Sequence, residues 1–276
     1  MVRFSASRFG AFAALSLCIV ACSPNSEESS APVSELPLEV NFGDSSEMWS
    51  FEKISSLPSE AFVFSDGFYF KDRDVKAVRM STLWDEVDPE GAMDVMTAYC
   101  TDEYFSVYTR EFVNIYKPFI IFEVDGKTPS EWTDVLQKAA PFFISFAFED
   151  GMPPYQDAGH KRPWGVKSVS FGQYDEKFAA FYSGDFANLS ELAHEGREIW
   201  INSCSSCHEG PGGSLGGHKA VRPWEVLAVH ATHNTQYFID YTRDPKSLNP
   251  VALMEPHPQY SDAQMEALVA FVTTGL

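Results

Sequence analysis

Short runs of β-branched and aromatic residues, separated by turn signals, fill residues 45–180. The turns include Ser65-Asp66-Gly67 and Asp125-Gly126, and runs of this length between such turns are typical of strands. The predicted strands are Ala61–Phe64, Phe68–Phe70, Val75–Met80, Val95–Cys100, Phe105–Tyr108, Phe119–Val124, Phe142–Phe148 and Val166–Phe171. Two brief helices are predicted, at Ser81–Val87 and from Ser130 to about Ala139. This pattern predicts an α+β domain with a mostly antiparallel or mixed sheet.

From residue 188 onward the apolar positions follow a helical period. The first predicted helix carries Leu189, Leu192, Ala193, Gly196, Ile199 and Trp200 on one face, and the last carries Met265, Leu268, Val269 and Val272. Asn188 with Glu191, and Ser261 with Gln264, are candidate capping boxes for the two helices. Gly196 removes side-chain bulk from the buried face of the first helix, so we expect another helix to cross it there.

The run Cys204-Ser205-Ser206-Cys207-His208 follows the first of these helices directly. This spacing is the attachment signature of c-type haem, in which two thiols reach the two vinyl groups of one porphyrin and the histidine reaches its iron. A zinc finger would need three to five residues between its histidines, whereas His230 and His233 have two between them. A redox dithiol would lie between a strand and a helix. The motif therefore predicts one covalent haem c, with a redox dithiol and a metal knuckle as alternatives.

Residues 188–276 resemble the class I cytochrome c family in the order of their motifs. The haem motif ends the first helix, Tyr237–Pro245 is similar to the family's aromatic helix, and Asn249-Pro250 leads to Met254 on a loop with several prolines. The family usually has proline directly after this methionine, but Glu255 intervenes here. The resemblance implies an all-α cytochrome c fold for this domain.

We predict that His208 is the fifth ligand of the haem iron and Met254 the sixth, because a thioether stabilises ferrous iron and raises the potential. Met265 is predicted to lie in the core. The histidines that compete for the sixth position are His218, His230, His233 and His257. Arg222 and Trp224 are candidate contacts of the haem propionates, with a surface arginine and a core tryptophan as the alternative. The carbonyl of Pro211 is a candidate acceptor for the Nδ1 hydrogen of His208.

The N-terminus has the features of an export signal. Two arginines precede an apolar segment from Gly10 to Val20, which is too short for a permanent membrane span. The segment ends in Ile19-Val20-Ala21-Cys22, which resembles a bacterial lipobox. We therefore predict that residues 1–21 are removed and that Cys22 is lipidated, with a plain secretory signal as the alternative. Ser23 at the next position favours the outer membrane over the inner one.

Residues 22–44 begin with a stretch rich in Ser, Glu and Pro, and we predict a disordered tether there. The chain has a formal net charge of −19, and removal of Arg3 and Arg8 with the signal leaves 18 basic and 39 acidic residues, or −21. Such a charge disfavours nucleic acid and favours a redox partner with a basic docking surface. After haem attachment and lipidation, Cys100 is the one cysteine left in the mature chain, so an internal disulfide is not expected.

A second resemblance concerns residues 60–175. The segments Cys100–Tyr104, Pro118–Lys127 and Arg162–Val169 are similar to parts of the sulfite-oxidase-type molybdopterin domain, in which a cysteine thiolate binds molybdenum. Cys100 is the candidate here, but it falls at a strand-turn position. The nearby Asp102 and Glu103 would also repel an anionic cofactor. We therefore expect a domain without molybdopterin that serves for docking.

Two functions are consistent with these motifs. The first is a periplasmic, membrane-tethered monohaem cytochrome that carries single electrons between redox partners, with residues 45–180 as the docking module. The alternative is a sulfite-oxidase-like molybdenum oxidoreductase with a fused haem c domain. A haem sensor or peroxidase is a third possibility, and it would require an open sixth position on the iron.

Overall fold

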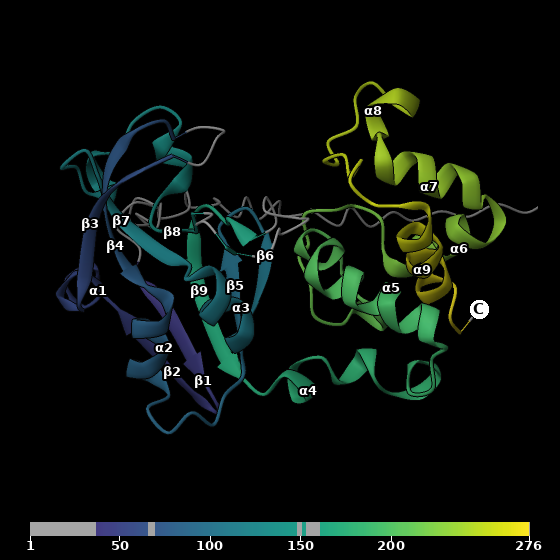
Figure 1. Cartoon of the computed structure of the whole chain (residues 1–276), viewed down its shortest axis with the longest axis horizontal. Helices are drawn as coiled ribbons and strands as arrows, with labels where there is room; N and C mark the ends of the chain where they lie inside the picture. Colours follow the sequence, from purple (N-terminus) through teal and green to yellow (C-terminus); the bar gives the residue numbers. More distant parts are fainter. Residues whose placement is uncertain (1–36, 66–69, 148–150, 153–160, 276) are drawn as a thin grey trace, which may run out of the picture. The chain divides into compact units, whose positions relative to one another are not determined.

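The computed structural model describes residues 37–65, 70–147, 151–152 and 161–275. The predicted signal peptide, Cys22 and most of the predicted tether lie outside these residues, as does most of the predicted strand Phe68–Phe70. Figure 1 shows two parts of different architecture: strands with a few helices over residues 38–172, here called the sheet region, and helices over residues 191–272, here called the helical region. This is the two-part fold class predicted from the sequence.

The first sheet of the sheet region is mixed. Its order is β2 (Ser45–Trp49), β1 (Leu38–Phe42), β9 (Val166–Gly172), β5 (Val95–Cys100) and β6 (Phe105–Thr109). β1 runs parallel to β9, and the other neighbours are antiparallel. In Figure 1 the purple β1 lies beside the green β9, although they are far apart in sequence. The sequence prediction missed β1 and β2. β1 lies within the predicted disordered tether, so that prediction was wrong for Leu38–Phe42. These residues form a strand because the alternate side chains Leu38 and Val40 are fully buried in the core.

The second sheet is antiparallel, in the order β3 (Ser59–Phe64), β4 (Arg73–Arg79), β7 (Phe119–Val124) and β8 (Phe143–Ser145). The short helices α1 (Phe51–Ser56), α2 (Met80–Val87) and α3 (Arg110–Tyr116) accompany the sheets. The predicted helix from Ser130 to Ala139 was wrong: two 3-10 turns, Pro129–Glu131 and Leu136–Ala139, take its place. Asp134 between them has a φ of +54°, which no α-helix tolerates.

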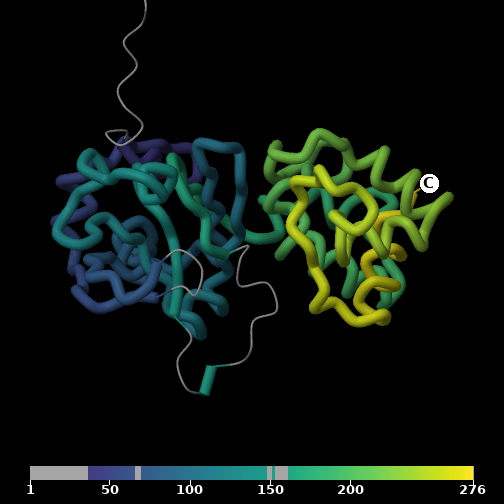
Figure 2. The backbone as a smooth tube through the Cα atoms, turned by 90° about the horizontal axis from the view of Figure 1, so that it is seen from above, coloured from purple at the N-terminus to yellow at the C-terminus, as the bar shows by residue number. Residues whose placement is uncertain are grey.

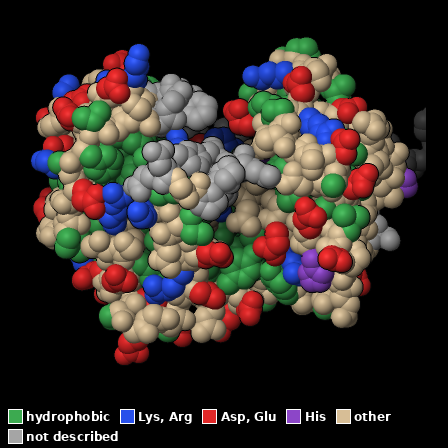
Figure 3. Space-filling model, in the orientation of Figure 1, with side chains coloured by type: hydrophobic (Ala, Val, Ile, Leu, Met, Phe, Trp, Pro, Cys, Tyr) green, Lys and Arg blue, Asp and Glu red, His purple; other side chains and the backbone are tan. Residues whose placement is uncertain are grey.

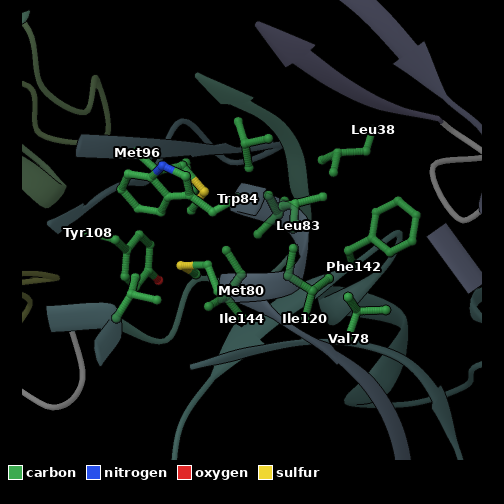
Figure 4. Close-up of a cluster of buried hydrophobic side chains, with 14 of the residues drawn as sticks. Leu38, Val78, Met80, Leu83, Trp84, Met96, Tyr108, Ile120, Phe142 and Ile144 are labelled. Carbon is green, nitrogen blue, oxygen red and sulfur yellow. The ribbon is translucent and has the colours of Figure 1, made fainter. Parts of the chain in front are cut away.

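The main core of the sheet region is formed by side chains of both sheets and of the short helices. Figure 4 shows part of it, with Met80, Leu83 and Trp84 of α2 among residues from β1, β4, β5, β6, β7 and β8. Strand β5 is buried on both faces. Met96, Ala98 and Cys100 belong to this core, whereas Val95 belongs to the core of the helical region, together with Phe105 and Val107 of β6. Because side chains of a strand alternate between faces, β5 links the two cores.

Between the sheet region and the helical region the chain forms α4 (Tyr174–Lys177) and the 3-10 turns Ala179–Phe181 and Gly184–Phe186. The helical region then comprises α5 (Glu191–Asn202), the 3-10 turns Cys204–Ser206 and Pro211–Gly213, α6 (Trp224–His233), α7 (Thr235–Arg243), α8 (Pro245–Leu248) and α9 (Asp262–Val272). Among the described residues no helix is both long and apolar enough to span a bilayer.

Helices α5 and α9 pack directly on each other, as expected from Gly196. A Cβ atom built on Gly196 would overlap the carbonyl oxygen of Ala267 in α9 and lie 2.8 Å from Cβ of Phe271. Figure 2 shows the chain from α5 (green) onward folding back so that α9 (yellow) returns to it. The capping box of Ser261 and Gln264 is present at the start of α9. The cap of α5 differs from the prediction: Ser190, and not Asn188, accepts the amide hydrogen of Ala193.

Candidate functional site

The Cys-x-x-Cys-His motif lies immediately after α5 and is wound into a tight turn. The amides of Cys207 and His208 both donate to the carbonyl of Cys204, at 3.2 and 3.0 Å. The hydroxyl of Ser205 donates to the carbonyl of Ile201 in the last turn of α5, at 2.6 Å. The two cysteines are half-buried, and neither is part of a disulfide bond. The fold thus anchors the backbone of the motif to α5, and both sulfur atoms stay outside any disulfide, as covalent attachment to a porphyrin requires.

The imidazole of His208 lies in an apolar setting. Its ring centroid is 5.9 Å from that of the Trp200 side chain, and its Nδ1 atom is buried without a hydrogen-bond partner among the described residues. The pKa of His208 is lowered to about 4, chiefly by burial and also by the charges of His257 and Arg222, while the backbone of Arg222 acts in the opposite direction. The imidazole is therefore neutral near pH 7, the state in which a ring nitrogen can bind iron.

A glycine-rich loop packs on the backbone of the motif. The amide of Gly217 donates to the carbonyl of Ser205 at 2.7 Å, and the amide of Ala220 donates to that of Cys207 at 2.9 Å. A Cβ atom on Gly216 would overlap the carbonyl oxygen of His208, and one on Gly217 that of Ser206. Glycine is needed at both positions because two backbone segments lie in direct contact. The predicted acceptor role of Pro211 is not seen, since its carbonyl accepts the amide of Ser214 at 3.2 Å.

The loop that carries Met254 comes close to the motif. The negative charge of Glu255 raises the pKa of the Cys207 thiol, and the charge of His257 lowers that of His208. The loop is fixed to α7 because the amide of His257 donates to the carbonyl of Thr242 at 3.1 Å. Met254 itself is half-buried. Neighbours of Met254 on this loop thus act electrostatically on the motif, and Met254 as the sixth ligand stays a prediction.

The competing ligands have other surroundings. Met265 is fully buried in the core of α9. His218 pairs with Glu209, with Nδ1 2.5 Å from Oε1. The ring of His230 lies 5.8 Å from that of Tyr237, between centroids, and His257 is buried and stacks on Tyr260 at 5.6 Å. Of these residues, His257 is the one whose charge acts on His208, so it stays the nearest rival to Met254.

The two candidate propionate contacts have different environments. Trp224 is buried in the core, with its ring 4.8 Å from Trp200 and 5.4 Å from Phe271 between centroids. Arg222 is exposed and lies over the ring of Tyr241 at 5.8 Å. Trp224 therefore packs as a core tryptophan, and both the backbone and the charge of Arg222 act on the pKa of His208.

The residues around the motif fit a haem group. Val221 and Leu253 are 95% and 97% exposed, although both are large and apolar. Val221 follows Ala220, which bonds to Cys207, and Leu253 precedes Met254. Two thiols, a neutral imidazole and a thioether are a suitable donor set for a porphyrin and its iron.

The sequence prediction missed one contributor to this site, the turn between β5 and β6. Lys219 of the glycine-rich loop forms an ion pair with Asp102, with Nζ 2.6 Å from Oδ2. Burial raises the pKa of Cys207 to about 11, the Lys219 charge opposes this rise, and Asp102 and Glu255 add to it. No signal in the sequence connects Asp102 to the motif, because the contact depends on how β5 and β6 pack against the helical region.

The helix crossing at Gly196, the haem motif at the end of α5 and the methionine loop define a cytochrome c domain. Residues 191–272 match the family model described as cytochrome C oxidase, cbb3-type, subunit III. A curated relative, cytochrome c oxidase subunit 2 of Alkalihalophilus pseudofirmus, is 30% identical over 105 residues, which are 35% of this chain and 31% of that protein. The chain thus matches less than a third of the length of this relative.

A solved structure, the sulfane dehydrogenase SoxCD from Paracoccus pantotrophus, is a structural neighbour with a TM-score of 0.36 and 12% sequence identity. The likeness covers 51% of this chain and 39% of that one. It is too small to define an activity for either region.

Proposed function

We propose that this chain is an exported, lipid-tethered monohaem c-type cytochrome that carries single electrons between redox partners. The observation that carries the proposal is the position of Cys204, Cys207 and His208 at the end of α5, in a domain that matches a cytochrome c family model. A cytochrome c domain is an electron-transfer module, and it indicates an extracytoplasmic or membrane-associated location, as does the oxidase-subunit relative.

Each residue of the site has a distinct part in this proposal. Cys204 and Cys207 would hold the porphyrin by thioether bonds, and His208 and Met254 would bind its iron. Bound haem c supplies one-electron chemistry between ferrous and ferric iron. The contacts of Gly216 and Gly217 keep the motif rigid, so the ligands change position little when the charge on the iron changes.

The sheet region is proposed to be the docking module for a partner. Its Cys100 is fully buried in an apolar core, and burial raises the pKa of its thiol, an effect to which the charge of Asp102 adds. A neutral, enclosed thiol is a poor ligand for molybdenum, which supports docking over the molybdenum oxidoreductase. Asp and Glu side chains are spread over the face drawn in Figure 3, which suits a partner with a basic surface.

The test of the proposed function is an optical spectrum with metal analysis. After expression in a host that matures c-type cytochromes, we expect haem that stays attached in denaturing gels, one iron per chain and no molybdenum. A colourless protein would refute the cytochrome, and one molybdenum per chain would favour the oxidoreductase instead. Electron transfer to a partner should slow as ionic strength rises, because salt screens the acidic surface.

The lipid tether is tested separately. A Cys22→Ala variant should no longer separate with membranes, whereas a Cys18→Ala variant, altered within the part of the signal that is removed, should still do so. Membrane association of Cys22→Ala equal to that of the unaltered protein would contradict the tether.

A further inference from the structure

The turn between β5 and β6 rests on the loop that supports the haem motif. The carbonyl of Glu103 accepts the amide hydrogen of His218 at 3.2 Å. Lys219 and Asp102 form the ion pair described above, and the ammonium group of Lys219 also lies over the ring of Tyr104 at 5.7 Å. These contacts join residues 102–104 of the sheet region to residues 218–219 of the helical region.

The same loop touches the motif on its other side. A Cβ atom on Gly217 would overlap the carbonyl of Ser206 and also lie 3.0 Å from the carbonyl of Glu103, so this one residue is enclosed between the motif and the turn. Ala220, directly after Lys219, donates to the carbonyl of Cys207 at 2.9 Å. Three layers of backbone therefore follow one another: motif, loop and turn.

The charges of this contact are close to the proposed attachment site. Lys219 and Asp102 are both half-exposed, with side-chain exposures of 48% and 53%, and their opposite charges both act on the Cys207 thiol. The charge of Glu255 acts on this thiol as well, and Glu209 is paired with His218. With the ion pair intact, the two opposite charges lie together, so their effects on a nearby group largely cancel.

We propose that Asp102 of the sheet region neutralises Lys219 and thereby keeps the reduction potential of the haem from rising. The inference rests on the proposed haem attachment at Cys204 and Cys207. Ferric iron carries one positive charge more than ferrous iron, so a nearby uncompensated cation favours the ferrous state and raises the potential, and an uncompensated anion lowers it. Asp102 cancels the effect of Lys219 as long as the turn stays on the loop.

Redox titrations of four proteins test this proposal: the unaltered protein, Asp102→Asn, Lys219→Gln and the double variant. Asp102→Asn leaves Lys219 uncompensated and should shift the potential upward. Lys219→Gln leaves Asp102 uncompensated and should shift it downward. The double variant should return close to the unaltered value, and both single shifts should shrink in high salt because the pair is half-exposed.

The opposite signs separate an electrostatic role from a structural one. If the pair only held the turn in place, both single variants would loosen the same contact and shift the potential in the same direction. Lys246→Gln, an exposed lysine of α8, is the matched control and should leave the potential unchanged. Shifts of equal sign, or shifts no larger than that of the control, would overturn the proposal.

Two further variants guard against misfolding. Asp102→Glu and Lys219→Arg keep both charges and should keep the potential; if they shift it as much as the neutral variants do, the charge argument is wrong. A colourless unaltered protein would instead refute the proposed function, so the two failures are distinguishable.

Discussion

The sheet region and the helical region differ in how well their own side chains cover their apolar surface. In the described part of the sheet region the exposed large apolar residues are Met48 and Val63. In the helical region they are Leu192, Val221, Val226, Val229, Leu248, Val251 and Leu253. One of them, Val221, directly follows Ala220, whose amide donates to the carbonyl of Cys207 in the haem motif. Under the proposed function we therefore expect bound haem to complete the apolar core of the helical region, and we expect the sheet region to fold without it.

The largest effect expected from this difference follows loss of haem attachment. In the double variant Cys204→Ala/Cys207→Ala we expect no covalent haem and loss of native structure in the helical region, because a ligand that binds only the folded state contributes its binding free energy to folding. Hydrogen exchange resolved by residue checks this: amides of α5 and α9 should lose protection, and those of β4 and β7 should keep it. Ser205→Ala is the control that leaves both thiols in place. Equal loss of protection in both regions would show that they fold as one unit.

The next largest effect concerns the crossing of α5 and α9. Gly196→Val places a side chain where the carbonyl of Ala267 lies, so the helices must separate, and we expect the free energy of unfolding to fall by about 3 kcal/mol. Denaturant titration of the haem-loaded protein measures the change. Glu195→Val, on the exposed side of the same helix, should cost less than about 1 kcal/mol, the cost of lower helix propensity alone. A similar loss in both variants would contradict the close crossing.

A smaller effect is expected from the buried Asp88 of the sheet region. Asp88 accepts the amides of Ala92 and Met93 and pairs with Arg110, with Oδ2 2.6 Å from Nη2. Asp88→Ala should lower the free energy of unfolding by about 2 kcal/mol, because two backbone amides and a half-buried guanidinium lose their acceptor. Asp85→Ala, at an exposed position of α2, is the control.

The pH dependence of this loss has a definite sign. Burial acts to raise the pKa of Asp88, but the amides of Met93 and Ala92 and the guanidinium of Arg110 outweigh it and hold the pKa below its usual value. A lowered folded-state pKa stabilises the protein above the unfolded-state value of about 4, and this stabilisation is lost as the pH falls through the folded-state value. The stability gap between the unaltered protein and Asp88→Ala should therefore narrow in acid. A stability gap that is constant with pH would contradict the lowered pKa of Asp88.

The smallest effect on folding is expected at the sixth ligand. Met254→Ala should leave the haem attached but change the absorption spectrum and lower the potential, because the thioether that stabilises ferrous iron is lost. Carbon monoxide should then bind the reduced protein readily. Met265→Leu, a swap of similar volume in the core, should keep the spectrum and cost less than about 1.5 kcal/mol. If the spectrum and potential of Met254→Ala equal those of the unaltered protein, Met254 is not the sixth ligand, and His257 becomes the candidate.

Local patterns in the sequence determined much of this protein. The extents of β5 and β7, the capping box at Ser261, the close crossing at Gly196 and the haem motif each depend on residues only a few positions apart or on one residue type. Such features follow from side-chain alternation, from the geometry of a helix start and from the absence of a Cβ atom.

Only the tertiary structure decided which distant residues meet. Val40 pairs with Val169 of β9 although the sequence around it resembles a tether, and Trp224 fills the core beside Trp200. Asp102 and Lys219, 117 positions apart, form an ion pair beside the haem motif. The physical reason is that a contact of this kind depends on the path of the backbone between the two residues. The chemical nature of the two residues does not determine that path.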